Sequence, residues 1–301
     1  MPAIQEKKPA RGGSASGGKT LVSRDGTNIY YEIYRPAQDF PSGSGEPRRS
    51  PASALPTLFF VHGIGGDVDA WQFVRPFLSA QGYGAVAMDL RGHGHSDHPK
   101  HRAAHNIERI EEDIQAVMDA EHVRKPILIG HSGGAVVAAQ FAAHHSDLLQ
   151  KLILINGSYC PPSWLASPLL RGIANVVISV GGFISPPSYK KWHSPYPLGK
   201  THKEFEIYGL ARTMFYNSLR SYLYTSYELI NIDLSAHLEK ISIPTLLIAS
   251  EHDGIFPVHI QQHMQKKIPN SKLIVLKDTN HVSVLNNPKG VAHAMLEFLR
   301  F

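Results

Sequence analysis

Residues 127–137 read ILIGHSGGAVV. An apolar run of strand type leads through a Gly-x-Ser-x-Gly segment directly into small residues typical of a helix. Such a strand-to-helix turn is so tight that the positions two before and two after the serine must be small, and Gly130 and Gly134 are. The turn places Ser132 at a helix N-terminus, where the helix dipole and free N–H groups favour developing negative charge. The alternative is a Gly-rich turn that only joins a strand to a helix.

Apolar strand candidates and amphipathic helices alternate around this stretch. The alternation is typical of a mostly parallel central sheet with helices on both faces, and it predicts the α/β class. Residues 28–34 instead alternate apolar and polar side chains, as an antiparallel edge strand would. The expected parallel strands are 57–61, 85–89, 127–130, 152–155, 245–249 and 273–276, and the expected helices are 70–80, 106–121, 133–144, 258–267 and 288–299.

The alternation breaks once, between Ile155 and Pro244. This stretch holds eight of the twelve tyrosines and no clear parallel strand. A structureless loop of that length inside a compact domain is improbable. We therefore predict an inserted, mostly helical lid at residues 157–231, with residues 20–156 and 232–301 forming the core.

The N-terminal segment carries much of the positive charge. Residues 1–19 are rich in Gly, Ser and Lys and contribute +3 of the formal net charge of +5, which predicts a disordered basic tail. The Pro-rich segment at residues 37–55 is expected to be a surface connection between two strands. No basic stripe is interleaved with aromatic residues, so no nucleic-acid partner is expected.

Other features narrow the compartment and the class of protein. Cys160 is the single cysteine, which excludes an intrachain disulfide framework. The sequence shows no secretory apolar core, and no uninterrupted apolar stretch reaches the ~20 residues that span a bilayer. We expect a cytoplasmic protein without stable membrane insertion. The sequence leaves its oligomeric state open.

Two further residues complete a catalytic constellation with the serine. A serine hydroxyl is a poor nucleophile at neutral pH and needs a base. Asp253 and His281 each follow the carboxyl end of a predicted strand, the edge where sites assemble in open parallel sheets. The chain order of serine, acid and histidine is that of enzymes with such a turn. Glu251 and Asp278 are rival carboxylates in the same loops.

Over residues 20–301 the chain resembles the lidded α/β-hydrolase superfamily, in particular its serine esterase and lipase-like members. The resemblance rests on the Gly-x-Ser-x-Gly turn, on HGIGG at residues 62–66 and on DLRGHGHS at residues 89–96. Two positions depart from the family pattern, because Ser250 and Asn280 stand where glycines are common.

The resemblance implies a role for five residues. Ser132 is expected to be the nucleophile, His281 the general base and Asp253 the acid that orients the histidine. The backbone N–H groups of Ile64 and Gly133 are expected to form the oxyanion hole. A serine at the turn excludes the epoxide hydrolase and haloalkane dehalogenase chemistries of similar proteins, which use aspartate there.

The expected activity is therefore acyl transfer to water through an acyl-serine, on a small or medium apolar carboxylic ester. Lactones, thioesters and C–C bonds beside a ketone are alternative substrates on the same residues. A non-catalytic ligand-binding receptor on this fold is a further alternative. No cofactor and no metal are expected.

The lid residues suggest the nature of the substrate. Ligand pockets are mostly apolar with a few polar groups. The apolar residues between Leu169 and Ile184 are expected to pack the lid onto the sheet or to line an apolar pocket. The aromatic residues expected to bind substrate are Tyr208, Phe215, Tyr216 and Tyr222.

Histidines are numerous around the predicted site. A dense cluster lies in a Gly- and Pro-containing loop, where zinc ligands of defined geometry are not expected. We interpret it as a polar loop beneath the site. His131 is interpreted as a packing or supporting residue next to the nucleophile. The cluster consists of His93, His95, His98, His101 and His105.

Overall fold

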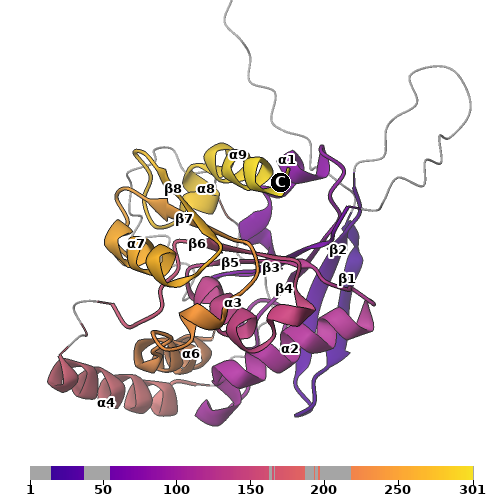
Figure 1. The fold of residues 1–301 in the computed structure, drawn as a ribbon. Coiled ribbons are helices and arrows are strands. Elements are labelled where there is room, and N and C mark those ends of the chain that lie inside the picture. Colours follow the sequence, from indigo (N-terminus) through magenta and orange to yellow (C-terminus); the bar gives the residue numbers. More distant parts are fainter. Residues whose placement is uncertain are drawn as a thin grey trace, which may run out of the picture.

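The computed structural model describes residues 15–36, 55–162, 165, 167–186, 193, 196 and 218–300. Eight strands form one sheet in the order β1-β2-β4-β3-β5-β6-β7-β8 (Figure 1). The neighbouring pairs from β4 to β8 are parallel, whereas β1 pairs with β2 and β2 pairs with β4 in antiparallel orientation. The predicted α/β class with a mostly parallel sheet is confirmed. The strands are β1 (Ala15–Val22), β2 (Asn28–Tyr34), β3 (Leu58–Val61), β4 (Ala85–Met88), β5 (Ile127–His131), β6 (Lys151–Ile155), β7 (Thr245–Ser250) and β8 (Ser271–Leu276).

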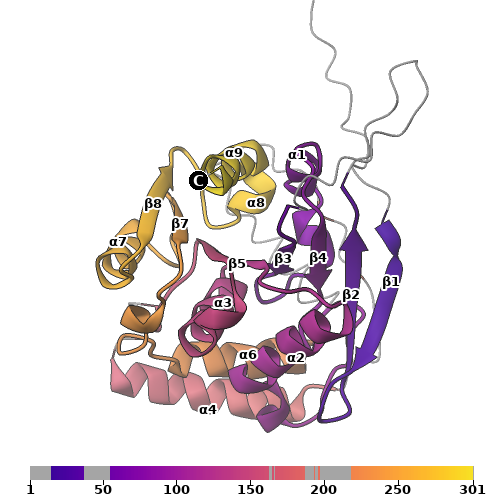
Figure 2. The same cartoon turned by 45° about the vertical axis from the view of Figure 1, so that its right-hand side comes forward.

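The helices cover both faces of the sheet (Figures 1 and 2). The expected helix at residues 70–80 is two short ones, η1 (Val68–Trp71) and α1 (Arg75–Ser79). Pro76 explains the break, because proline lacks an N–H and is favoured where a helix starts rather than in its interior. The others are η2 (Arg102–His105), α2 (Ile107–Ala120), α3 (Gly133–His144), η3 (Ser146–Leu148), α4 (Pro168–Ile184), α6 (Leu219–Asn231), η5 (Leu238–Lys240), α7 (Val258–Lys267), α8 (Ser283–Asn286) and α9 (Pro288–Leu299).

Alternate side chains of each buried strand enter two separate cores. In β3, Phe59 and Val61 pack with residues of α2, α3 and α7. Leu58 and Phe60 point to the other face and pack with residues of α1, α8 and α9. Fully burying an apolar side chain of this size contributes roughly 1.5–3 kcal/mol, so the two cores fix the sheet between its helical layers.

The N-terminal end of the described chain corrects two expectations. Ala15 to Lys19 belong to β1, so the predicted tail of residues 1–19 is wrong for these five positions. Because β1 pairs with β2, the segment 28–34 is an interior strand of the sheet and not its edge. Lys19 also bonds the Glu121 carboxylate at 2.8 Å, which ties β1 to the end of α2. Residues 37–54, within the predicted surface connection, lie outside the described residues.

The helices α4 and α6 lie in the chain between β6 and β7. They pack against each other, with α6 on the side of the core and α4 outermost (Figures 1 and 2). Across the described residues, no helix combines the length and the apolar character needed to cross a membrane.

Candidate active site

The turn between β5 and α3 holds Ser132 in a strained backbone conformation, with φ 53° and ψ −121°. A Cβ atom at Gly130 would lie 2.3 Å from the carbonyl oxygen of Gly134. A Cβ atom at Gly134 would lie 2.4 Å from the carbonyl oxygen of His62. Both distances are far below van der Waals contact, so any larger residue would open the turn. The glycines thus allow the serine to stand at the end of the strand on a tight bend.

Ser132, His281 and Asp253 form one hydrogen-bonded chain. His281 Nε2 lies 2.7 Å from Ser132 Oγ, and His281 Nδ1 lies 2.8 Å from Asp253 Oδ2. An ionised carboxylate only accepts hydrogen bonds, so Nδ1–H must be the donor to Asp253. The neutral ring then presents the lone pair of Nε2 to the serine hydroxyl, which donates.

Asp253 is itself fixed by its own loop. Its second oxygen, Oδ1, accepts the backbone N–H groups of Ile255 and Phe256, each at 2.8 Å. The residue is only 5% exposed, at the carboxyl end of β7. These contacts leave the other oxygen free to face the imidazole.

The rival carboxylates lie away from the histidine ring. Glu251 accepts Lys277 Nζ at 2.8 Å and the backbone N–H of Asp278 at 3.0 Å. Glu251 and Asp278 are both exposed. Of the three candidate acids, the structure places Asp253 on the histidine.

Two backbone N–H groups lie beside the serine. Gly133 is the first residue of α3, so its N–H has no intrahelical acceptor. A Cβ atom at Gly133 would lie 3.4 Å from the backbone nitrogen of Ile64, and one at Gly63 would lie 3.0 Å from Ser132 Cβ. The structure therefore brings together the two residues expected to form the oxyanion hole.

His62 holds the loop that carries Ile64. Its Nε2 accepts the N–H of Leu90 at 3.0 Å, so the ring proton is on Nδ1 and donates to the Gly63 carbonyl at 2.8 Å. Burial lowers the pKa of His62, which keeps the ring neutral in this tautomer. The loop is thus tied to the segment that follows β4.

Asn156 was not predicted from the sequence. Its side chain contacts the loop that carries His281. Asn156 Nδ2 donates to the carbonyl oxygen of His281 at 2.7 Å, and His131 Nε2 lies 3.0 Å from the same oxygen. Burial lowers the pKa of His131 to about 4, so its ring is neutral and Nε2–H donates. Asn156 is fully buried directly after β6 and has a positive φ of 47°, which asparagine tolerates better than most residues. Its position at the same sheet edge as Ser132 is the signal that could have identified it.

Ser250 and Asn280, the two residues that depart from the family pattern, also stabilise the loops around the site. Ser250 Oγ donates to Asn156 Oδ1 at 3.1 Å. Asn280 Oδ1 accepts the N–H of Val282 at 3.0 Å and Nδ2 of Asn286 at 2.6 Å. Side chains that glycine lacks thus hold the two loops that carry Asp253 and His281.

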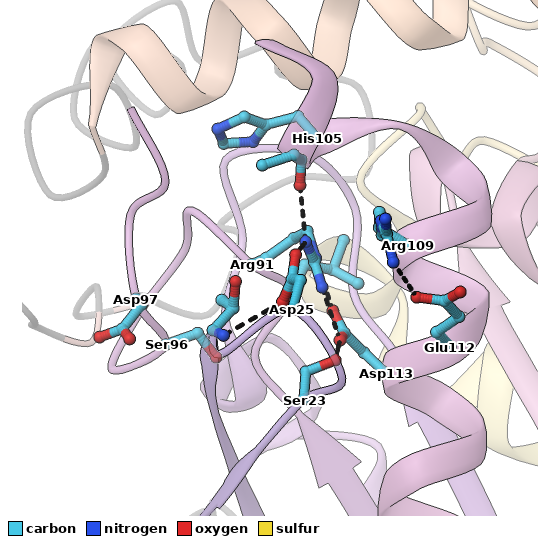
Figure 3. A network of polar contacts seen from close by, with 12 residues as sticks. Ser23, Asp25, Arg91, Ser96, Asp97, His105, Arg109, Glu112 and Asp113 are labelled. Carbon is cyan, nitrogen blue, oxygen red and sulfur yellow. Dashed lines mark hydrogen bonds and ion pairs between the residues drawn. The ribbon is translucent and has the colours of Figure 1, made fainter. Parts of the chain in front are cut away.

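A buried arginine anchors the loop after β4 (Figure 3). Arg91 donates to both oxygens of Asp113, at 2.7 and 2.8 Å, and to Asp25 at 2.7 Å. Ser23 donates to Asp113 at 2.5 Å and joins the turn between β1 and β2 to this network. Breaking a buried ion pair by removing one partner typically costs ~3–5 kcal/mol, so the network fixes the position of this loop.

The histidine cluster is mostly packed into the same region. His93 is fully buried with Nδ1 3.1 Å from the Arg91 carbonyl, and its ring lies 5.4 Å from that of His62. His105 Nε2 lies 3.0 Å from the Pro99 carbonyl, and burial lowers the pKa of His105 to about 4. In the part of the chain that is described, three potential metal ligands converge elsewhere, at the exposed Glu251, His252 and Asp278.

One residue of the predicted lid reaches the turn that carries Ser132. A Cβ atom at Gly133 would lie 2.8 Å from Leu229 Cδ1 of α6. Tyr222 is seven residues earlier on the same helix face and is half-buried, and burial raises its pKa. Tyr208, Phe215 and Tyr216 lie outside the described residues.

The apolar segment of residues 169–184 corrects another expectation. It forms α4, but its large apolar side chains do not pack onto the sheet, because eight of them are 50–78% exposed. The inner side of α4 contacts α6 instead.

Comparison with known proteins identifies the family of the chain. The model of the alpha/beta hydrolase family matches residues 58–294. The mouse protein named ABHD8 is 32% identical over 251 residues, which cover 82% of this chain and 56% of the mouse protein. The chain thus spans little more than half of that relative. The pimeloyl-[acyl-carrier protein] methyl ester esterase of Vibrio vulnificus strain YJ016 is 28% identical, over 81% of this chain and 94% of the esterase.

Solved structures share the fold at lower identity. A thermophilic esterase from Thermogutta terrifontis superposes with a TM-score of 0.72 and 22% identity, over 95% of this chain and 98% of the esterase. The enol-lactonase from Burkholderia xenovorans LB400 gives a TM-score of 0.71 and 20% identity, over 94% of this chain and all of the lactonase. With the family model matched over most of its length, the chain belongs to the alpha/beta hydrolase family.

Proposed function

We propose that the protein is a serine hydrolase that cleaves a carboxylic ester through an acyl-serine intermediate. The observation that carries the proposal is the continuous chain from Ser132 Oγ to His281 Nε2 at 2.7 Å and from His281 Nδ1 to Asp253 at 2.8 Å. The esterase among the sequence relatives supports the same class of reaction.

The geometry supports a two-stage reaction. Ser132 Oγ attacks the ester carbonyl while His281 Nε2 takes the hydroxyl proton, and Asp253 stabilises the imidazolium that forms. The developing oxyanion accepts hydrogen bonds from the N–H groups of Ile64 and Gly133. The histidine returns the proton to the leaving alcohol, and water repeats the sequence to release the acid.

The contacts behind the site support its orientation. His281 is held at its carbonyl by Asn156 and His131, and the Ile64 loop is held by the neutral ring of His62. Because these groups are buried, little reorganisation is needed when charge develops. This preorganisation favours a working enzyme over a receptor that retains the same fold.

The side chains nearest the turn favour an apolar substrate. Leu229 and Ile64 both approach Gly133, within 2.8 and 2.9 Å of where its Cβ atom would be. We propose that residues 157–231 form a lid over the serine, with Tyr222 on the substrate side of α6. The proposed acyl or alcohol group is therefore short to medium and uncharged.

Labelling with a fluorophosphonate probe tests the reaction, since the probe needs an activated serine. We expect labelling of the wild type and none of Ser132→Ala. An ester series with increasing acyl length then tests the pocket. Each methylene that is accommodated should stabilise the transition state by up to ~0.8 kcal/mol, so kcat/KM should climb with chain length and then fall sharply once the pocket is full. Absence of labelling in the folded wild type would favour the receptor instead.

A further inference from the structure

The helix α4 has its apolar and polar sides reversed relative to a surface helix of a globular protein. Eight of the twelve large apolar side chains that are exposed in the described residues belong to this one helix. They recur at a helical spacing along its 17 residues, a length of about 25 Å. They are Leu169, Leu170, Ile173, Val176, Val177, Val180, Phe183 and Ile184.

The polar and small residues of α4 face the protein. Asn175 and Asn231 of α6 exchange two amide hydrogen bonds, at 2.9 and 2.8 Å. Gly182 allows close approach to α6, since a Cβ atom there would lie 2.3 Å from the Tyr224 ring. These contacts lie on the α6 side of α4, which therefore cannot turn its apolar side inward without losing them.

Two arginines fix α4 from neighbouring elements. Arg220 of α6 donates to the carbonyl oxygens of Phe183 and Ser185 at the end of α4, at 3.2 and 3.0 Å. Arg102 of η2 lies 3.5 Å from Ser179 Oγ and stacks 4.1 Å from the Tyr227 ring centroid. The exposed positions of α4 itself carry no charged side chain.

Besides residues 1–19, the segment of residues 157–231 that contains α4 carries positive net charge. Residues 157–231 contain seven Lys and Arg residues and three Glu residues, a net +4 by sequence, and of these Arg171, Arg220 and Glu228 are described by the structure. Residues 20–156 and 232–301 together contain 19 basic and 21 acidic residues, a net −2. The apolar face of α4 suits the boundary between headgroups and acyl chains of a lipid bilayer. The positive net charge of the surrounding sequence suits anionic headgroups.

We propose that the outer face of α4 docks the protein onto an anionic phospholipid surface, with the helix lying in the plane of the interface. The exposed face is contiguous and free of charge, which is the pattern of helices that bury one side among lipid headgroups. A second copy of the chain fits less well, because residues 157–231 carry a net charge of the same sign, +4, in both copies. The docked helix is separated from Ser132 by one helix layer, α6.

Vesicle sedimentation of the full chain tests this proposal. The probes are phosphatidylcholine vesicles with and without phosphatidylglycerol, at low and high salt. We expect the protein to sediment with the phosphatidylglycerol vesicles, less so at high salt. The variant Ile173→Glu/Val177→Glu should bind at least roughly tenfold more weakly, because two apolar contacts are lost and like charge faces the anionic surface.

A matched control places the same charges elsewhere. Val22→Glu/Leu55→Glu also replaces two exposed apolar residues, at 68% and 46% exposure and outside α4. It should bind vesicles as the wild type does, and circular dichroism should show that both variants are folded. No sedimentation of the wild type, equal binding by the α4 variant, or a wild-type dimer that the α4 variant dissolves without any vesicle binding would each overturn the proposal.

The test is independent of the proposed ester hydrolysis. The α4 variant should keep wild-type turnover of a short water-soluble ester, because Ile173 and Val177 contact none of the reacting residues. If the wild type binds vesicles and lacks ester turnover, the hydrolase proposal fails and the docking proposal stands.

Discussion

The sheet edge at Ser132 and the outer face of α4 distribute polar and apolar groups in opposite ways. At the sheet edge, ionisable side chains are buried, with Asp253 and His281 each 5% exposed. On α4, apolar side chains are exposed, with Val176 at 64% and Phe183 at 78%. Each region departs from the usual rule that polar groups lie outside and apolar groups inside.

This difference indicates what each region can do. A buried polar group costs free energy unless it is hydrogen-bonded, and the edge meets this condition with pairs such as Asn156 and the His281 carbonyl. Those groups are therefore fixed before a substrate arrives. The large apolar side chains on the outer face of α4 are at least half exposed in the free protein, so much of their favourable transfer from water is still available to a binding partner.

The largest expected effect is at the nucleophile. Ser132→Ala should lower the turnover of a nitrophenyl ester by roughly 10⁴-fold or more, because no other group can form the acyl intermediate. The matched change on α4, Ser179→Ala, should leave turnover unchanged. Steady-state kinetics of both variants measure this contrast. Near-normal turnover by Ser132→Ala would contradict the prediction.

The acid provides the next contrast, within the edge itself. Asp253→Asn should keep the fold and lower kcat by up to roughly 10⁴-fold, because the histidine loses its ionised partner. Glu251→Gln, which changes an exposed carboxylate bonded to Lys277, should stay within about twofold of the wild type. If Glu251→Gln were inactive and Asp253→Asn active, the assignment of the acid would be wrong.

Buried histidines should make the folded state sensitive to acid. Burial lowers the pKa of both His105 and His131 from 6.5 to about 4. Between these pH values the unfolded chain binds more protons than the folded one, so the free energy of unfolding falls as the pH falls from 6.5 towards 4. Each shift corresponds to at most about 3 kcal/mol.

Denaturant titrations across this pH range check the prediction. His105→Gln should reduce the slope of the unfolding free energy against pH by up to one proton. His101→Gln, at an exposed position in the same loop, is the control. A stability that does not change between pH 6.5 and 4.5 would contradict the expected sign.

The smallest contrast compares two asparagine side chains. Asn156→Ala should cost about 1–3 kcal/mol of stability, since it leaves buried partners unpaired, and should lower kcat roughly tenfold with little change in KM. Asn175→Ala removes an exposed amide pair and should cost no more than about 0.5 kcal/mol. Equal losses in kcat for the two variants would argue against a positioning role for Asn156.

The class of fold and the three side chains of the proposed triad were predictable from the amino-acid sequence. Short apolar strands that alternate with helices can be buried only in a mostly parallel sheet, and they were found at nearly the expected residues. The Gly-x-Ser-x-Gly turn was predictable because only glycine avoids the 2.3–2.4 Å clashes beside Ser132. Ser132, Asp253 and His281 each follow the carboxyl end of a predicted parallel strand, and these ends meet at one edge of the sheet.

Features that depend on contacts between distant segments of the chain were visible only in the tertiary structure. Ala15 to Lys19 pair with β2 as part of the sheet instead of belonging to the expected tail. Strand pairing depends on the neighbouring strand and not only on local composition. Asn156 meets His281 across 125 positions of sequence, which no local pattern records. The periodicity of α4 predicted its apolar face, but only the packing of its polar side against α6 decided that this face points outward.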